Sequence, residues 1–334
     1  MLVIWALLGG ALLGAGEGRT ALGIEATKFT LNGAPTFLLG LSYYAGLDAP
    51  PESVAADLDE LRADGFNWLR VWATWTMFGH DSSCVDTHGQ PREPYLSRLK
   101  ALVAAGDERG LVVDVTLSRK RGDSPLADFD SHLNAVRTLA RELRPWRNVY
   151  FDLANERTVP DRFVSYDDLG RLAAAVREID PDRLLTASDT DELDDAKLVG
   201  YLRTAQLDFL SPHRPRSTAS ARDNRAQTER VLADLERLGL TAPVHDQEPF
   251  RRNFSRGWEP TAEDFLTDLN GAIAGGAAGW CLHNGDSRFA PEGRPRRSFD
   301  LRQAEGRLFD QFDEVERQVV AAIRQVCDAP ILAG

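Results

Sequence analysis

From about residue 28 onward, short apolar runs alternate with longer amphipathic stretches. The short runs have the length and composition of buried strands, and the longer stretches have the periodicity of helices that cover one face of a sheet. This alternation is typical of parallel strands joined by crossover helices. The predicted strands are 37–44, 66–73, 111–118, 148–155, 183–188, 207–212, 242–247 and 278–284.

Helices are predicted between these strands and after the last one. Several of them end in glycine, a common residue at helix C-termini. The clearest segments are 51–65, 95–110, 131–145, 167–180, 224–239, 261–276 and 308–327. Eight strand–helix units predict an α/β protein with a single closed (β/α)8 TIM barrel. A doubly wound sheet is the alternative, but no G-x-G-x-x-G turn follows the first predicted strand.

The N-terminal segment differs from the rest of the chain. Residues 1–16 form an apolar run that ends in small residues, as a signal peptide does. We therefore predict a signal-peptide-like or disordered segment over 1–24, a folded domain over 25–334, and a secreted or periplasmic protein. No Lys or Arg precedes the run, so the alternative is an uncleaved start and a cytoplasmic protein.

Composition and charge narrow the range of partners. The chain has 334 residues, with 39 Lys and Arg against 51 Asp and Glu and a net charge of −12. This balance argues against nucleic acid or an anionic membrane surface as a partner. The three cysteines fit no zinc spacing, so buried or incidental thiols are the better interpretation. Because the sequence has no cofactor motif, we expect neither a metal nor a cofactor. We also expect the protein to be a monomer.

Polar residues follow several of the predicted strands, where the active site of a (β/α)8 barrel lies. Asn155 and Glu156 follow the fourth strand, and Glu248 follows the seventh. Two carboxylates from distant strands suit the cleavage of a glycosidic bond, because one can protonate the leaving oxygen while the other attacks or stabilises the anomeric carbon. Each acid also has a plainer interpretation: Glu156 could pair with Arg157 or another arginine at the barrel rim, and Glu248 could be solvated in a loop.

Six segments, taken in order, resemble the large clan of retaining (β/α)8 glycoside hydrolases that includes family 5 cellulases and mannanases. They are FTLNGAPTFLLGLSYY, LRVWATW, DLANER, SPHRP, QEPF and GWCLHN. The resemblance runs over most of the chain from about residue 28. It implies a short N-terminal hairpin, which would cap the bottom of the barrel, and a carbohydrate substrate.

The resemblance also implies a role for each matching residue. Glu156 would be the acid/base and Glu248 the nucleophile of a double displacement that hydrolyses β-linked oligo- or polysaccharides. Asn155 would bind the sugar 2-hydroxyl, and Arg70 would keep the nucleophile ionised while an apolar setting raises the pKa of the acid/base. The other substrate-binding candidates are His213, Tyr44, Trp72 and Trp280.

Two departures from the clan keep other functions open. Pro215 stands where the clan often has a tyrosine that hydrogen-bonds the nucleophile, and Ser118 ends the third strand where family 5 commonly has a histidine. A catalytically inactive, carbohydrate-binding barrel is therefore one alternative. The other is a metal-dependent hydrolase that uses His213, His245 and His283 with nearby acids, although the chain has no H-x-H or H-E-x-x-H spacing.

Overall fold

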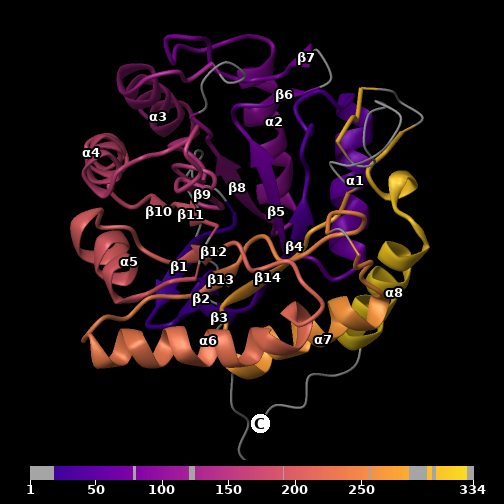
Figure 1. Ribbon diagram of the computed structural model, residues 1–334. Helices are drawn as coiled ribbons and strands as arrows, with labels where there is room; N and C mark the ends of the chain where they lie inside the picture. The colour runs from indigo at the N-terminus through magenta and orange to yellow at the C-terminus, as the bar shows by residue number, and fades with distance from the viewer. Residues whose placement is uncertain are drawn as a thin grey trace, which may run out of the picture.

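The computed structural model describes residues 19–77, 80–119, 125–190, 192–255, 257–285, 299–302 and 306–328. Seven parallel strands form one curved sheet in the order β10-β9-β8-β5-β4-β14-β13 (Figure 1). In chain order these strands are β4 (Leu38–Ser42), β5 (Trp68–Trp72), β8 (Val112–Thr116), β9 (Val149–Asp152), β10 (Leu184–Thr186), β13 (His245–Asp246) and β14 (Gly279–Leu282).

Two short strands close this sheet into a barrel. β11 (Ser188–Asp189) follows β10 directly and pairs in parallel with β12 (Ser211–Pro212). Parallel bridges then join Leu210 to Val244 and His213 to Glu248, which connects β12 to the β13 edge of the sheet. The predicted (β/α)8 barrel is therefore confirmed, with its fifth, sixth and seventh strands shorter than the sequence suggested.

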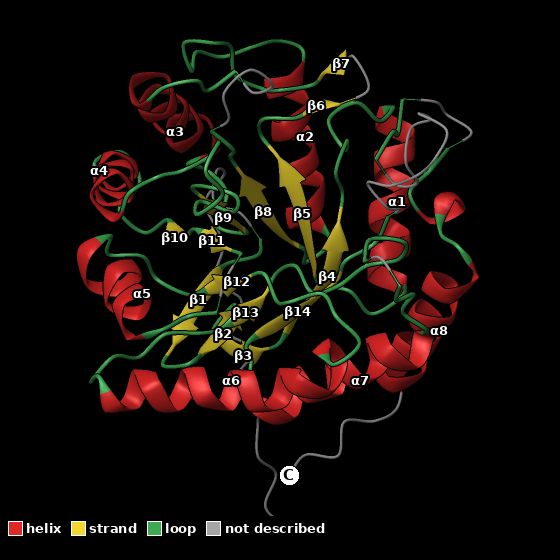
Figure 2. Cartoon of the chain, viewed as in Figure 1, coloured by secondary structure: helices red, strands yellow, loops and turns green. Residues whose placement is uncertain are grey.

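Helices surround the strands, as Figure 2 shows. They are α1 (Pro51–Ala63), α2 (Tyr95–Glu108), α3 (Phe129–Leu143), α4 (Tyr166–Arg177), α5 (Asp195–Val199), α6 (Ser220–Arg237), α7 (Ala262–Gly275) and α8 (Glu314–Asp328). A π-helix, η1 (Gly200–Thr204), continues α5, and a 3-10 helix, η2 (Phe309–Gln311), precedes α8. A two-stranded ribbon of β6 (Thr76–Met77) and β7 (His80–Asp81) lies in the loop after β5.

Local side chains explain where several helices begin. Asp128 caps α3 by accepting a hydrogen bond from the Ser131 backbone N–H, and Ser165 caps α4 in the same way through the Asp168 N–H. Thr261 and Asp264 form a reciprocal capping box at the start of α7. Each cap satisfies an N–H group that would otherwise lack a partner within the helix. These caps fix the ends of the loops that leave the barrel.

An N-terminal sheet covers one end of the barrel. It consists of β1 (Leu22–Glu25), β2 (Lys28–Leu31) and β3 (Ala34–Thr36), so it has one strand more than the predicted hairpin. Phe29 of β2 packs edge-on against Phe209, with ring centroids 5.0 Å apart, and joins an apolar cluster with Trp68 and Tyr150. The sheet thus closes the end of the barrel at which the strands begin.

The folded domain starts before residue 25, the predicted boundary. That residue is the last of β1, and the backbone N–H groups of Arg19 and Thr20 donate hydrogen bonds of 2.9 and 2.8 Å to the Asp107 carboxylate. Residues 1–18, which carry the predicted signal sequence, lie outside the described residues. Among the described residues, no helix is long and apolar enough to cross a membrane.

The pleat of the strands sorts side chains between the barrel interior and the helices. On β5, Trp68 and Arg70 face the interior, while Leu69 and Val71 belong to the apolar core shared with the helices. Trp68 lies at the apolar end of the interior, and Arg70 lies one layer above it among acidic groups.

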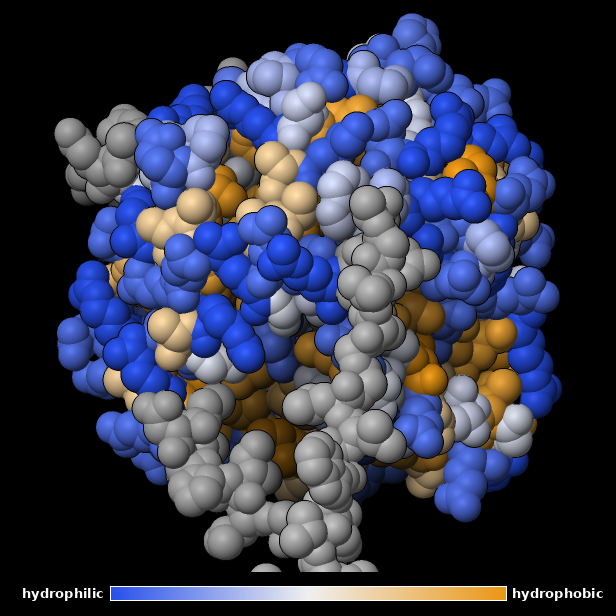
Figure 3. All heavy atoms as spheres, turned by 180° about the vertical axis from the view of Figure 1, so that it is seen from behind, coloured by the Kyte–Doolittle hydropathy of each residue, from blue (hydrophilic) through white to orange (hydrophobic). Residues whose placement is uncertain are grey.

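Seen from behind in Figure 3, the surface is mostly hydrophilic, with smaller hydrophobic groups between the polar residues.

Candidate active site

Glu156 and Glu248 come together at the end of the barrel where the strands finish. Glu156 lies shortly after β9, and Glu248 lies two residues after β13. One oxygen of each carboxylate and one ring nitrogen of His213 all lie within 4.8 Å of one another. The barrel thus brings together two acids that are 92 positions apart in sequence (248 − 156). The two carboxylates therefore lie close together, as the sequence predicted.

The backbone of Glu156 adopts an uncommon conformation. Its φ of 48° lies in the left-handed region, which costs free energy for a residue with a side chain and is concentrated at functional sites. The Glu156 N–H donates a hydrogen bond of 2.9 Å to Ser188 Oγ on β11, which holds this conformation. The strained residue is therefore fixed by a contact with the neighbouring strand.

The Glu156 carboxylate contacts a guanidinium group and an imidazole and not the apolar surroundings that we expected. Arg162 Nη1 donates a hydrogen bond of 2.8 Å to Oε2, and His213 Nδ1 lies 3.3 Å from Oε1. Burial alone would raise the pKa of Glu156, but the hydrogen bond with His213 and the charge of Arg216 bring it below its ordinary value. The predicted upward shift of this pKa is therefore wrong for the described structure.

The Glu248 carboxylate lies between two guanidinium groups. Arg70 Nη1 donates a hydrogen bond to Oε1, and Arg216 Nη2 donates one of 2.9 Å to Oε2. His213 Nδ1 and His283 Nε2 lie 3.4 and 3.7 Å from the same Oε2. Burial opposes ionisation, but the nearby His213 and the charges of Arg70 and Arg216 hold the pKa of Glu248 well below its ordinary value. Glu248 is accordingly a carboxylate at neutral pH.

Arg70 connects Glu248 to the interior of the barrel. Its Nη2 donates hydrogen bonds of 2.9 Å to both Asp152 Oδ2 and Asn155 Oδ1, and its Nε lies 3.5 Å from Asp114 Oδ2. Burial alone would lower the pKa of Arg70, but the nearby carboxylates raise it above its ordinary value. Arg70 thus lies beside Glu248, as predicted, and it also pairs with carboxylates in the barrel interior.

The same contacts orient Asn155 and His213. Asn155 accepts a hydrogen bond from Arg70 through its side-chain oxygen, which fixes the orientation of its amide group. His213 lies between the two glutamates, and its Nε2 lies 3.2 Å from Gln247 Oε1. Gln247 in turn donates to Asp114 Oδ2, whose pKa burial raises to about 7. His213 thus contacts both glutamates of the site.

Tyr44 and Trp72 form an aromatic wall beside Glu248. Their rings stack at 4.7 Å, and the Arg70 guanidinium lies 4.4 Å from the Trp72 ring centroid. Tyr44 OH forms a hydrogen bond of 2.6 Å with His283 Nε2. Phe299 packs on Tyr44 with centroids 4.1 Å apart, which leaves Tyr44 and Trp72 almost fully buried. The two aromatics adjoin the acids, as the sequence predicted, but expose little ring surface.

Trp280 does not lie at the site. It is fully buried in the apolar core that the strands share with the helices, and its Nε1–H donates a hydrogen bond of 2.6 Å to Asp268 of α7. The physical reason is the pleat of β14: Cys281 and His283 face the barrel interior, so Trp280 faces outward. We therefore correct the prediction that Trp280 binds substrate.

Three residues that contact the two acids or their neighbours were not predicted from the sequence, namely Arg162, Arg216 and Arg251. His283, which lies 3.7 Å from Glu248, was named only for the metal-dependent alternative. Arg216 directly follows Pro215, the position where the clan often has a tyrosine, and it supplies a hydrogen bond to Glu248. The positive charge of the RPRS segment was visible in the sequence, but nothing in its pattern showed that Arg216 turns inward.

The three residues Glu156, His213 and Glu248 also have the spacing of a possible metal site. However, arginine N–H groups already bind both oxygens of Glu248 and one oxygen of Glu156. A cation would have to displace these guanidinium groups or lie against their charge. His245, which belonged to the predicted histidine set, lies instead against Trp68 and Phe29 near the opposite end of the barrel. The structure therefore does not favour the metal-dependent alternative.

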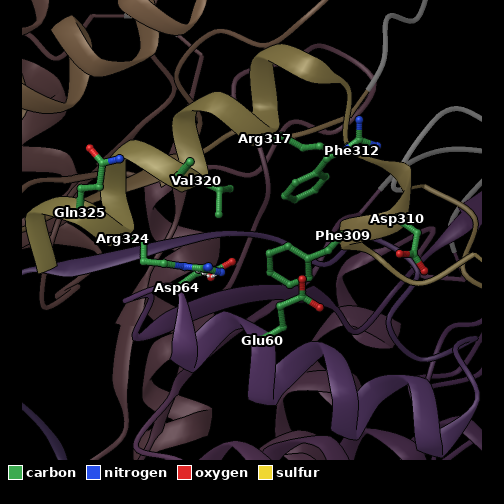
Figure 4. Close-up of a pocket in the computed structure, with 10 residues that line it drawn as sticks. Glu60, Asp64, Phe309, Asp310, Phe312, Arg317, Val320, Arg324 and Gln325 are labelled. Atoms are coloured by element: carbon green, nitrogen blue, oxygen red, sulfur yellow. Dashed lines mark hydrogen bonds and ion pairs between the residues drawn. The ribbon is translucent and has the colours of Figure 1, made fainter. Parts of the chain in front are cut away.

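A separate hollow of about 580 Å3 lies between α1 and α8 (Figure 4). Two of its acids are already paired, Asp64 with Arg324 and Glu60 with Arg307. Phe309 and Phe312 form its apolar side. It lies outside the barrel and does not include the two glutamates at the barrel mouth.

Comparisons with known proteins gave matches in structure alone. No protein-family model matches the sequence, and the search of curated proteins found no relative. A solved structure described as a glycoside hydrolase is 16% identical, with a TM-score of 0.67 over 94% of this chain and 75% of the other. The β-mannanase of the blue mussel Mytilus edulis is 15% identical, with a TM-score of 0.60 over 94% and 98% of the two chains.

A third match is the GH5_18 protein of Streptomyces cattleya in complex with GlcNAc. It is 20% identical to this chain, with a TM-score of 0.60 and coverage of 88% of this chain and 81% of the other. At such identities the matches establish the fold. The chain therefore has the (β/α)8 fold of these glycoside hydrolases, in agreement with the resemblance read from its sequence.

Proposed function

We propose that the chain is a glycoside hydrolase that cleaves β-linked oligo- or polysaccharides with retention of configuration. The observation that carries this proposal is the proximity of Glu156 and Glu248, with one oxygen of each within 4.8 Å. Retaining enzymes place their carboxyl groups about 5–5.5 Å apart, whereas inverting enzymes need about 6.5–9.5 Å to admit a water molecule. The short separation therefore favours direct attack by one carboxylate.

Glu248 is the better nucleophile of the two. Its pKa lies well below the ordinary value, so it is ionised over the physiological range. Glu248 would attack the anomeric carbon, while the bond to the leaving oxygen breaks and Glu156 donates a proton to that oxygen. In the second step Glu156 would take a proton from water, which attacks the anomeric carbon and releases Glu248.

The charge of Glu248 would let Glu156 perform both roles. In the free protein this charge acts to raise the pKa of Glu156 and so favours a proton on the acid. When Glu248 becomes an ester of the sugar, its charge is lost and the pKa of Glu156 falls further, which suits a general base. The ion pair with Arg162 opposes protonation, so we expect substrate to displace Arg162 from Glu156.

A carbohydrate-binding barrel without catalysis is the second candidate. The observation that favours it is the ion pairing of both glutamates with arginines, which would suit two structural acids. The two candidates differ in turnover. Wild-type protein should release sugars with retained configuration from at least one glycan of a broad panel, and Glu248→Ala should remove nearly all of this activity. Binding of glycans without any hydrolysis would instead support the binding module.

A further inference from the structure

Positive charge gathers at the barrel mouth of a protein whose net charge is −12. Besides Arg70, the groups nearest to the two glutamates include Arg162 and Arg216. Arg251 lies next to them, within 3.3 Å of His283 Nε2. Arg162 and Arg216 each pair with one of the two glutamates, so the charge of Arg251 is the one in this group that remains to attract an anion.

Arg216 and Arg251 lie on one aromatic side chain. Their guanidinium carbons are 4.4 and 4.6 Å from the centroid of the Phe254 ring. Burial lowers the pKa of Arg216, and the neighbouring charge of Arg251 lowers it further. The two like charges repel each other, and an oxyanion that binds both guanidinium groups would relieve the repulsion.

The charge of Arg251 has no carboxylate partner among the described residues. Its Nη1 contacts two uncharged acceptors. These are the Tyr44 hydroxyl oxygen at 3.2 Å and His283 Nε2 at 3.3 Å. Burial keeps the pKa of His283 well below its ordinary value, so this imidazole is neutral. Arg251 Nε is buried without a hydrogen-bond acceptor in the described part of the chain. A buried donor of this kind is costly unless a ligand satisfies it.

Arg216 is the second arginine that pairs with the Glu248 carboxylate, after Arg70. Arg70 holds Glu248 Oε1, and Arg216 holds Oε2 at 2.9 Å while lying 3.9 Å from Glu156 Oε1. An anion that binds Arg216 would compete with Glu248 and free Oε2 for attack. The arrangement therefore links the arrival of an anionic ligand to the release of the proposed nucleophile.

Another hollow, of about 370 Å3, lies on the Glu156 side. It is lined by Arg119, Arg162 and Phe163, whose surface is 55% exposed, and by the acids Asp128 and Asp161. Arg162 Nε is buried without a hydrogen bond among the described residues. The exposed ring offers a stacking face for one sugar, and the two guanidinium groups offer hydrogen-bond donors to it.

We propose that the substrate is an anionic glycan, whose sugars carry carboxylate or sulfate groups, and that Arg216 and Arg251 bind the anionic group of the sugar at the two glutamates. This inference rests on the proposed function and names its substrate class. Guanidinium groups bind planar carboxylates and sulfates through paired, charge-assisted hydrogen bonds. The hollow at Arg119, Arg162 and Phe163 takes the next sugar along the chain.

The test compares glycans that share a backbone and differ in charge. Wild-type protein is assayed with β-1,4-mannotetraose and cellotetraose, with the tetrasaccharides that carry a C6 carboxylate on the same backbones, and with 6-O-sulfated cellotetraose. We expect kcat/KM for a charged tetrasaccharide to exceed that for its neutral counterpart by at least about 100-fold, with the advantage decreasing at high salt. The carboxylate and sulfate arms identify which oxyanion the site prefers.

Variants test whether Arg251 causes the preference for charged substrates. Arg251→Gln should lower kcat/KM for the charged substrate by about 10- to 100-fold, mainly through KM, as expected for a lost charge-assisted bond. Arg251→Lys should restore part of it, and the matched control Arg225→Gln, which removes the same charge from the exposed surface of α6, should change nothing. Efficient cleavage of the neutral tetrasaccharides, unaffected by Arg251→Gln, would overturn the inference and leave the proposed hydrolase intact.

Binding measurements separate this inference from the proposed function. Calorimetry with the same tetrasaccharides uses Glu248→Gln protein, so that turnover cannot interfere. Charge-dependent binding that Arg251→Gln abolishes, with no hydrolysis by wild-type protein, would support the anionic ligand and contradict the hydrolase. Equal affinity for charged and neutral tetrasaccharides would contradict the anionic ligand.

Discussion

Arg70 and Glu248 form an ion pair at the centre of the barrel, where Arg70 is fully buried. The same guanidinium binds Asp152 and lies 3.5 Å from Asp114, so one cation serves three carboxylates. This arrangement joins stability to the proposed chemistry, because the group that compensates the buried acids also keeps Glu248 ionised.

Replacement of Arg70 should therefore affect stability as well as activity. Arg70→Met would leave buried carboxylates without their cation, and we expect the free energy of unfolding to fall by about 3–5 kcal/mol. Arg70→Lys keeps the charge but not the planar set of donors, so its loss should be smaller. Urea unfolding of both variants checks this order. An Arg70→Met protein as stable as wild type would show that the acids do not depend on Arg70.

Glu156→Ala should remove acid assistance but not nucleophilic attack. An aryl glycoside with a good leaving group should still form the intermediate, whereas a glycoside with a poor leaving group should react far more slowly. External azide should then accelerate turnover and give a glycosyl azide of retained configuration, because no general base remains to exclude an anion. An azide product of inverted configuration would contradict the assignment of Glu156, and NMR of the product distinguishes the two.

The sequence located these two acids because strand ends are visible in an apolar pattern. The predicted strands end at Asn155 and at Gln247, directly before Glu156 and Glu248, so both acids were expected at the barrel mouth. The same pattern could not assign Trp280, because GWCLHN contains large residues on both faces of the strand. Only the register with the neighbouring strands shows that Cys281 and His283 face inward.

The positions of the arginines at the barrel mouth could not be predicted from the sequence, for a different reason. Arg216 and Arg251 lie in loops, where no periodicity fixes the direction of a side chain. Their positions depend on tertiary contacts with Phe254, Tyr44 and Glu248, which come from separate parts of the chain. The downward shift of the Glu156 pKa had the same origin, since it depends on the tertiary contacts with His213 and Arg216.

Trp280→Phe should lower stability without changing substrate binding. The substitution removes the Nε1–H that donates to Asp268 and leaves a smaller ring in the core, so we expect a loss of about 1–3 kcal/mol in the free energy of unfolding. The matched variant Trp72→Phe alters the wall beside Glu248 and should raise KM. A raised KM for Trp280→Phe at unchanged stability would return Trp280 to the candidate substrate-binding residues.

Asp268 should make stability depend on pH. Burial raises its pKa to about 7, with a further rise from the nearby charge of Asp246. The folded state therefore retains a proton that the unfolded state has lost above about pH 4, so the free energy of unfolding should fall as pH rises from 4 to 7. Asp268→Asn imitates the protonated form and should gain stability relative to wild type, by up to about 4 kcal/mol, between pH 4 and pH 8. Parallel pH dependences for the two proteins would contradict this shift.

Arg216→Gln tests whether Arg216 acts on Glu248 electrostatically. Removing a cation that lies 2.9 Å from Oε2 destabilises the ionised form of Glu248, so the pKa of Glu248 should rise toward its ordinary value. Because the nucleophile must be ionised, the acidic limb of the kcat/KM profile should move to higher pH by about one unit. Arg225→Gln, which loses the same charge on the surface, should keep the wild-type limb. A uniform loss of activity across pH, without a displaced limb, would mean that Arg216 only positions the loop after His213 and does not tune the charge of Glu248.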